Sequence, residues 1–326
     1  MSGDRSRAMV IAGSPPGPDF FAAASGWQSL GARSAAIDLP GMSIGFEGMD
    51  EAWHARFLES YAPYSRDAAT GPAAPMVTFR ASRGGPEQYI APPPAGVEAI
   101  NPVWVEVEDD PAAAGHCHVR CCTYGLAAAF SSAGGAGSAV FSRGSFDPRE
   151  RAVENLLRVA TAWLAIMRGG LLMHSASIIK DGRAYLFFGQ SGSGKSTLAA
   201  LSRRGQVASD DLSLLLPGDG GDIEIVGAPF RGTYTGGAAV SGRYPVRAAF
   251  RLKKAVPPER SAVEPIKPGM AMAEAIANLP FVVDQLHIRP DLFGRAERVL
   301  TSFPIRLLRF GRLDDSYWEA IAAAGL

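Results

Sequence analysis

A glycine-rich segment in the second half of the chain constrains its fold more than any other feature. The segment begins at Gly189, continues through four variable positions, and closes with Gly194, Lys195 and Ser196. This spacing is typical of the phosphate-binding loop of nucleotide-binding proteins, provided that a strand precedes the loop and a helix follows it.

The residues on either side predict that strand and that helix. Residues 184–188 are apolar and aromatic, which is typical of a buried strand. The run Ser-Thr-Leu-Ala-Ala-Leu after Lys195 predicts a short helix that ends before Gly205, with Arg203 and Arg204 in its last turn. This context favours a phosphate-binding loop over a chance glycine-serine turn.

The residue types of the segment suit a polyphosphate ligand. Gly192 and Gly194 let backbone N–H groups surround phosphate oxygens without a Cβ in the way. The Lys195 ammonium can reach the terminal phosphates, and the Ser196 hydroxyl is the expected ligand of Mg²⁺. We therefore predict that a nucleotide binds to the whole segment: Gly189, Gln190, Ser191, Gly192, Ser193, Gly194, Lys195, Ser196 and Thr197.

The sequence before the loop predicts a β-hairpin. Residues 171–179 form an apolar run that carries His174, and Asp181-Gly182 is typical of a two-residue hairpin turn. The strand with His174 should then pair antiparallel with the strand that leads into the loop. His174 is either an ordinary buried histidine or a catalytic group beside the phosphate site.

Two adjacent carboxylates follow the loop. Asp210 and Asp211 lie between a predicted short strand at 206–209 and another at 212–216. Carboxylates next to a phosphate loop suit Mg²⁺ binding and proton abstraction, and the alternative is a solvated acidic turn.

A basic, glycine-rich stretch comes next. Residues 227–254 contain no acidic residue and six basic ones, namely Arg231, Arg243, Arg247, Arg251, Lys253 and Lys254. We predict that Arg231, which lies between Phe230 and Gly232, stabilises charge on a transferring phosphoryl group. Lys253 and Lys254 are interpreted as a solvated basic face.

The chain length predicts two domains. A prior of about 150 residues per domain divides the 326 residues into a smaller β-rich α+β domain at 1–146 and a second domain at 147–326. Segment 134–147, rich in Gly, Ala and Ser, marks the boundary, and a helix follows from about 148 to 167. In the first domain we expect a helix at 50–61 and strands at 9–12, 35–39, 76–79 and 103–107.

Composition limits the classes of partner. The net charge is zero, so no global field favours nucleic acid or membrane, and no apolar segment suits a membrane span or signal peptide. The three cysteines, Cys117, Cys121 and Cys122, fit a reducing cytoplasm. The cluster from His116 to Cys122 could bind a metal, but the second ligand pair typical of zinc sites is missing. We interpret the cluster as a half-buried strand.

These features together resemble the HPr kinase/phosphorylase-related family. The resemblance rests on the strand with His174, the Asp-Gly hairpin, the loop 189–197 and the run Val-Ala-Ser-Asp-Asp at 207–211, and it covers about residues 147–320. The wider superfamily includes the ATP-dependent phosphoenolpyruvate carboxykinases. The resemblance implies an α/β fold: a P-loop kinase core with a mixed sheet, distinct from a doubly wound nucleotide domain.

The resemblance also implies an activity and a set of roles. The activity is Mg²⁺-ATP-dependent transfer of a phosphoryl group to a Ser or Thr hydroxyl of a protein or peptide. Asp210 matches the general base, Asp211 its acidic partner at the metal, and His174 the histidine beside the base. Arg231 with Gly232 resembles a signature loop, although the glutamate that precedes this arginine in the family is replaced here by Pro229 and Phe230.

Alternative functions remain open at the level of sequence. The chain could be a nucleotide-binding regulatory or partner module that transfers nothing, or a carboxykinase-like enzyme acting on a small acid. A transport-type ATPase would show a Leu-Ser-Gly-Gly-Gln signature, which the sequence lacks. A homo-oligomer is possible under any of these.

Overall fold

The computed structural model describes residues 28–69, 74–84, 103–141, 152–230, 232–234, 236–255, 260–311 and 314–326. These residues form two compact units. The first contains the described residues up to Ala36 together with Ile44–Ser60 and Arg66–Val159, and the second contains Ile37–Ser43, Tyr61–Ser65 and Ala160–Leu326. The predicted domain boundary between 146 and 147 lies outside the described residues.

The first unit contains most of an eight-stranded mixed sheet in the order β3-β1-β2-β4-β8-β7-β6-β5. Strand β4 lies parallel to β2 on one edge and to β8 on the other, and the strands from β8 to β5 are antiparallel. The strands are β1 (Arg33–Leu39), β2 (Met42–Met49), β3 (Ser65–Asp67), β4 (Val77–Arg83), β5 (Trp104–Asp109), β6 (Cys117–Thr123), β7 (Leu126–Ser131) and β8 (Gly135–Phe141).

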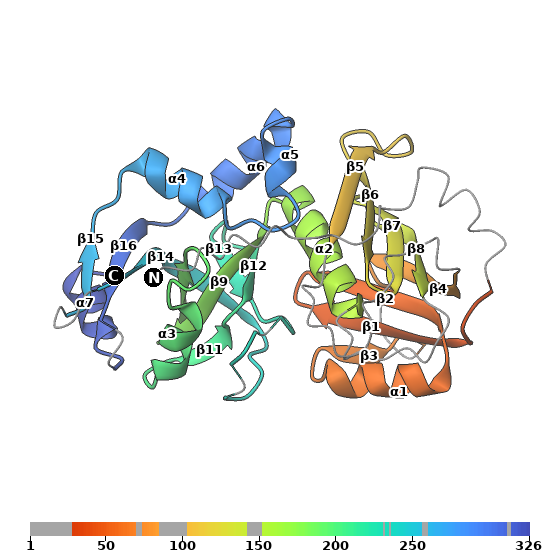
Figure 1. Cartoon of the computed structure of the whole chain (residues 1–326), viewed down its shortest axis with the longest axis horizontal. Coiled ribbons are helices and arrows are strands. Elements are labelled where there is room, and N and C mark those ends of the chain that lie inside the picture. Colours follow the sequence, from red (N-terminus) through yellow and green to blue (C-terminus); the bar gives the residue numbers. More distant parts are fainter. Residues whose placement is uncertain are drawn as a thin grey trace, which may run out of the picture. The chain divides into compact units, whose positions relative to one another are not determined.

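Helix α1 (Glu51–Ser60) covers part of this sheet (Figure 1). It buries Trp53 and Phe57, whose rings contact Phe46 of β2 edge-on. The helix expected at 50–61 is therefore confirmed. The strands expected at 35–39, 76–79 and 103–107 correspond to β1, β4 and β5, whereas the strand expected at 9–12 lies outside the described residues.

Two segments of this unit differ from their interpretation in the sequence. Residues 134–147 were assigned to a boundary because they are rich in small residues, yet Gly135–Phe141 forms strand β8 between β4 and β7. Small residues fit there because the Cβ of any larger residue at Gly137 would lie 2.8 Å from the ring of Phe79.

The cysteine cluster forms the expected strand, β6, but more of this strand is buried than the half that was expected. Cys117, Cys121 and Cys122 are all buried in β6, and Cys122 packs against Ala127 and Val140. Burial raises the pKa of the Cys122 thiol to about 12. Within the described part of the chain, no three His, Cys, Asp or Glu residues gather as a metal site.

The second unit contains the predicted loop and a second, mixed sheet. Helix α2 (Ala152–Met167) leads into it and agrees with the helix expected up to 167. The strands are β9 (Leu171–Lys180), β10 (Arg183–Phe188), β11 (Gln206–Ser209), β12 (Leu212–Pro217), β13 (Ile223–Val226), β14 (Arg243–Lys254), β15 (Ala262–Glu264) and β16 (Ile305–Phe310). The helices are α3 (Lys195–Leu201), α4 (Pro268–Ile276), α5 (Val283–Leu286), α6 (Pro290–Thr301) and α7 (Tyr317–Ala323).

Five strands of this sheet form a closed barrel. The order is β10-β9-β12-β13-β14-β16-β15, and a further parallel pairing joins β10 to β14. The strands β10, β9, β12, β13 and β14 therefore close into a ring, while β11 pairs with β9 outside it. The chain is thus an α/β protein with a β-rich first half, as its sequence indicates.

The hairpin predicted before the loop is present. Strands β9 and β10 pair antiparallel from Lys180 with Arg183 to Ser175 with Phe188. The turn residues Asp181 and Gly182 have φ angles of 51° and 72°, which are the left-handed values that Asp-Gly hairpin turns require.

An apolar core fixes α3 against the sheet. Leu198 and Ala199 of α3 are buried with residues from β9, β10, β14 and β16 and with Trp318 of α7. The core includes the stacked rings of Phe187 and Phe250, whose centroids are 5.5 Å apart. Because the loop connects β10 to α3, this packing holds both of its ends. None of the helices described is long and apolar enough to cross a membrane.

Candidate phosphate-binding site

The loop between β10 and α3 depends on glycines with unusual backbone angles. Gly192 and Gly194 have φ angles of 76° and 110°, which residues with a side chain rarely adopt. Gly194 is the residue that precedes α3, and its carbonyl accepts the N–H of Leu198. A side chain at either position would strain the turn that starts the helix.

Lys195 curls back over the loop. Its Nζ donates a hydrogen bond of 2.8 Å to the carbonyl of Gly189, and the residue is only 7% exposed. This burial lowers the pKa of Lys195, an effect opposed by the negative charge of Asp211. The ammonium is thus poorly solvated, which suits an anionic ligand that would compensate its charge.

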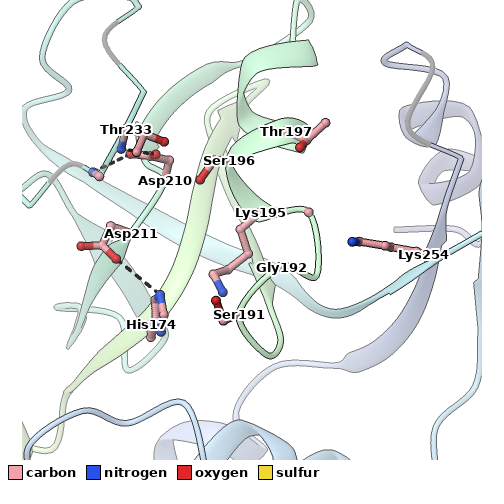
Figure 2. A pocket seen from close by; sticks show the side chains of 12 residues that line it. His174, Ser191, Gly192, Lys195, Ser196, Thr197, Asp210, Asp211, Thr233 and Lys254 are labelled. Atoms are coloured by element: carbon pink, nitrogen blue, oxygen red, sulfur yellow. Dashed lines mark hydrogen bonds and ion pairs between the residues drawn. The ribbon is translucent and has the colours of Figure 1, made fainter. Parts of the chain in front are cut away.

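A cavity of about 310 Å³ opens at this loop (Figure 2). Lys195 and Asp211 both reach it, although they are on different elements. The residues that line it are His174, Ser191, Gly192, Gly194, Lys195, Ser196, Thr197, Asp210, Asp211, Gly232, Thr233 and Lys254.

The two aspartates have different surroundings. Asp210 is 2% exposed and accepts three backbone hydrogen bonds, from the N–H groups of Gly232 at 2.7 Å, Thr233 at 3.0 Å and Tyr234 at 3.0 Å. Both oxygens of this carboxylate are therefore occupied by backbone donors. Asp210 therefore holds the 232–234 segment in place.

Asp211 faces the histidine instead. Its Oδ1 lies 3.4 Å from Nε2 of His174, as the dashed line in Figure 2 shows. The two side chains are 24% and 42% exposed, so both are accessible from the cavity. His174 is on β9 directly opposite Leu212, and its backbone N–H donates to the carbonyl of Asn278 at 2.7 Å.

Ser209 supports the same turn from beneath. Its buried hydroxyl donates to the carbonyl of Phe230 at 2.7 Å and accepts the N–H groups of Asp211 and Leu212 at 3.1 Å each. The strand end that carries both aspartates is therefore joined to Phe230 and to the segment 232–234 by the side chains of two consecutive residues, Ser209 and Asp210.

A comparison with protein families gives the relationship of this region. Residues 150–324, more than half of the chain, match the family described as SynChlorMet cassette protein ScmC. The chain belongs to the ScmC family. The matched segment contains every residue that lines the cavity. No curated protein matches the chain.

Most of the residues expected at the site in this ScmC-family chain do lie together. Ser191, Gly192, Gly194, Lys195, Ser196 and Thr197 line the cavity with His174 and both aspartates. Three further residues of the loop, Gly189, Gln190 and Ser193, do not line the cavity. Arg231 lies outside the described residues.

Two expectations for side chains differ from the structure. His174 was paired with Asp210, but it faces Asp211, because the carboxylate of Asp210 is turned toward the N–H groups of the 232–234 segment. Lys254, interpreted as a solvated surface lysine, is indeed exposed, but it also lines the cavity. Ser209 and Thr233 are site residues that the sequence analysis does not identify, whereas Gly232 belongs to the expected signature loop. A Cβ at Gly232 would lie 3.0 Å from Asp210 Oδ2, which is a tight contact.

We expect Asp210→Ala to lower the stability of the second unit. The substitution leaves three backbone N–H groups without their charged acceptor, and each such bond contributes about 1.5–3 kcal/mol. A loss of about 3 kcal/mol or more corresponds to a fall in Tm of roughly 6 °C or more, measurable by calorimetry. Asp211→Ala is the matched control and should lower Tm less. Equal shifts for the two variants would contradict the anchoring role of Asp210.

Proposed function

We propose that this protein is a Mg²⁺- and ATP-dependent kinase of the HPr kinase-like type, with residues 147–326 as its P-loop domain. The phosphoryl acceptor is a Ser or Thr hydroxyl of a protein or peptide. The observation that supports this most is that one cavity is lined by the loop, Lys195, Ser196 and the pair of Asp211 with His174. The resemblance of segment 147–320 to HPr kinases points to the same activity.

The donor binds over the loop in this proposal. The carbonyl of Gly189 now accepts the Lys195 hydrogen bond, and a phosphate oxygen is a stronger acceptor for the same ammonium. Phosphate charge also offsets the burial that lowers the pKa of Lys195. In this proposal the Lys195 ammonium therefore binds the two terminal phosphates of the donor.

The oxygen donors in the cavity fit Mg²⁺. Ser196 offers a hydroxyl and the aspartates offer carboxylates, and Mg²⁺ usually binds one or two carboxylates together with phosphate oxygens and water. The Ser196 hydroxyl with an oxygen of the aspartate pair would hold the ion. When bound, Mg²⁺ neutralises charge on the phosphates.

Asp211 takes the proton of the acceptor in this mechanism, in place of the Asp210 suggested by the resemblance. The carboxylate of Asp211 is accessible from the cavity and is held by His174, whereas that of Asp210 is buried under three donors. As the proton moves to Asp211, the hydroxyl oxygen bonds to the terminal phosphorus and the bond from phosphorus to the bridging oxygen breaks, releasing ADP. Positioning and charge compensation supply most of the rate in such transfers.

The acceptor is best sought among the products of the same cassette. The family is described as a cassette protein, so other products of that cassette are the first candidates. The experiment incubates the full chain with Mg²⁺-ATP and each cassette-encoded peptide or protein, and reads the acceptor mass. The expected result is a gain of one phosphoryl group on a Ser or Thr, absent with Lys195→Met.

Other outcomes identify the alternatives. Release of ADP and phosphate without any labelled acceptor would indicate an ATPase. Nucleotide binding with neither transfer nor hydrolysis would indicate a nucleotide-binding partner module, and transfer to a small carboxylic acid would indicate a carboxykinase-like enzyme. Each of these results rejects the protein-kinase proposal.

A further inference from the structure

We infer that Lys254 determines which phosphate donors the site accepts, by binding the phosphate that is farthest from Asp211. In a nucleoside triphosphate this is the phosphate attached to the nucleoside. The inference rests on the proposed function and adds a specificity-determining residue to it.

Strand alternation explains why Lys254 reaches the loop. Side chains two residues apart point to the same face of a strand. In β14, Phe250 and Leu252 are buried in the core with Leu198 of α3. Lys254 continues this face one step beyond the core, where the loop begins, and Lys253 points to the other face. Both lysines are exposed, but of the two only Lys254 lines the cavity.

Two linked contacts, both through Phe310, place the end of β14 beside the loop. Lys254 is paired in register with Phe310 of β16. The ring of Phe310 lies 3.5 Å from the position that a Cβ on Gly194 would occupy. The Lys254 side chain extends toward the loop in Figure 2, and its ammonium has no hydrogen-bond or ion-pair partner among the residues that the structure describes.

The loop separates Lys254 from Asp211. Strand β10, which leads into the loop, has β9 on one side and β14 on the other. His174 is on β9 and Lys254 ends β14, so their strands are two inter-strand spacings apart, about 10 Å. Figure 2 shows His174 with Asp211 on one side of the loop and Lys254 on the opposite side. A linear ligand that crosses the loop therefore meets a proton acceptor at one end and a cation at the other.

This arrangement discriminates by the length of the phosphate chain. The transferred phosphate lies at Asp211, the next phosphate lies over the loop amides and Lys195, and a third phosphate reaches Lys254. Pyrophosphate has only two phosphates and therefore makes the first two contacts without the third. Lys254 then favours triphosphate donors over pyrophosphate, and Lys195 acts on both.

The test compares the affinity of the full chain for Mg²⁺-ATP, Mg²⁺-tripolyphosphate and Mg²⁺-pyrophosphate by calorimetry. Lys254→Met should weaken ATP and tripolyphosphate about tenfold, as expected for the loss of one charge-assisted contact, and change pyrophosphate less than twofold. Lys254→Arg should restore most of the ATP affinity. Lys253→Met is the matched control, because Lys253 is on the same strand end and does not line the cavity; it should change no affinity more than twofold.

The outcomes separate this inference from the proposed function. If Lys254→Met leaves ATP affinity unchanged, or weakens all three ligands equally, the role of Lys254 is rejected while the loop assignment stands. If Lys195→Met also leaves every affinity unchanged, the phosphate site itself is rejected. If Lys253→Met lowers the affinity for ATP as much as Lys254→Met does, the effect comes from general surface charge and the specific contact of Lys254 is rejected.

Discussion

Replacing Asp211 by asparagine is expected to slow phosphoryl transfer severely and to leave nucleotide binding within about threefold of the unmodified protein. The side chain keeps its size and its hydrogen-bonding oxygen beside His174, but it no longer accepts a proton at neutral pH. A positioned general base contributes about 10²–10⁴-fold to the rate, so we expect kcat to fall by about 10³-fold. The measurement is the rate of acceptor phosphorylation at saturating ATP, together with calorimetric binding of ATP.

Asp222→Asn provides the control for Asp211→Asn. Asp222 is an exposed aspartate of the same unit and does not line the cavity. Its variant should retain full transfer. If Asp211→Asn retains transfer, the proton acceptor is another group. If it loses nucleotide binding as completely as transfer, Asp211 acts on Mg²⁺ or on the structure of the site rather than on the acceptor.

The second large effect concerns Lys195. We expect Lys195→Met to remove the stabilisation that nucleotide gives to the folded protein. A ligand at about 100 times its Kd stabilises by about 2.7 kcal/mol, which appears as a rise in Tm of several degrees with Mg²⁺-ATP. Methionine preserves the apolar stem and removes only the ammonium, so the rise in Tm should disappear.

The stability of the unliganded variant shows whether the effect is local. Burial lowers the pKa of Lys195, which means that the charged ammonium is poorly solvated in the folded state. Removing that charge should leave the Tm without ligand equal to or above that of the unmodified protein. A persistent rise with Mg²⁺-ATP in the variant would reject the assignment of residues 189–197 as the phosphate site. Lys253→Met should show the full ligand-induced rise.

The sequence predicts those parts of the site whose conformation is determined by residues close together in the chain. The turn at Asp181 and Gly182 requires left-handed backbone angles that these two residues tolerate, and the glycines at 192 and 194 serve the loop for the same reason. The apolar runs that flank them settle the strand before the loop and the helix after it. Each of these features is decided by residues within about ten positions of one another.

The different environments of the two aspartates depend on residues far from them in the sequence. Asp210 and Asp211 are neighbours of the same type, and nothing in their local sequence separates them. Their environments differ because Gly232, Thr233 and Tyr234, more than twenty positions later, donate to Asp210 alone. Closure of the barrel is likewise a property of strand pairing, because the contact between β10 and β14 joins segments far apart in the chain.

The sequence does contain an indication that Lys254 is a site residue. A count of the basic residues from 227 to 254 does not reveal it, because the count treats Lys254 like the other members of a charged stretch. Alternation along β14 gives a better indication: Ala248, Phe250 and Leu252 are buried on one face, and Lys254 is the next residue on that face. A lysine that ends an apolar face should be examined as a site residue whenever the neighbouring strand leads into a binding loop.

The closed barrel couples the positions of β9 and β14, the strands that carry His174 and Lys254 at the two ends of the cavity. In an open sheet, an outer strand can shift without moving the strand at the opposite edge. Here β9 and β14 are joined twice, once through β10 and once through β12 and β13. The hydrophobic residues of β13, none of which lines the cavity, therefore belong to the ring of strands that fixes the separation of β9 and β14, on which the donor preference that we infer depends.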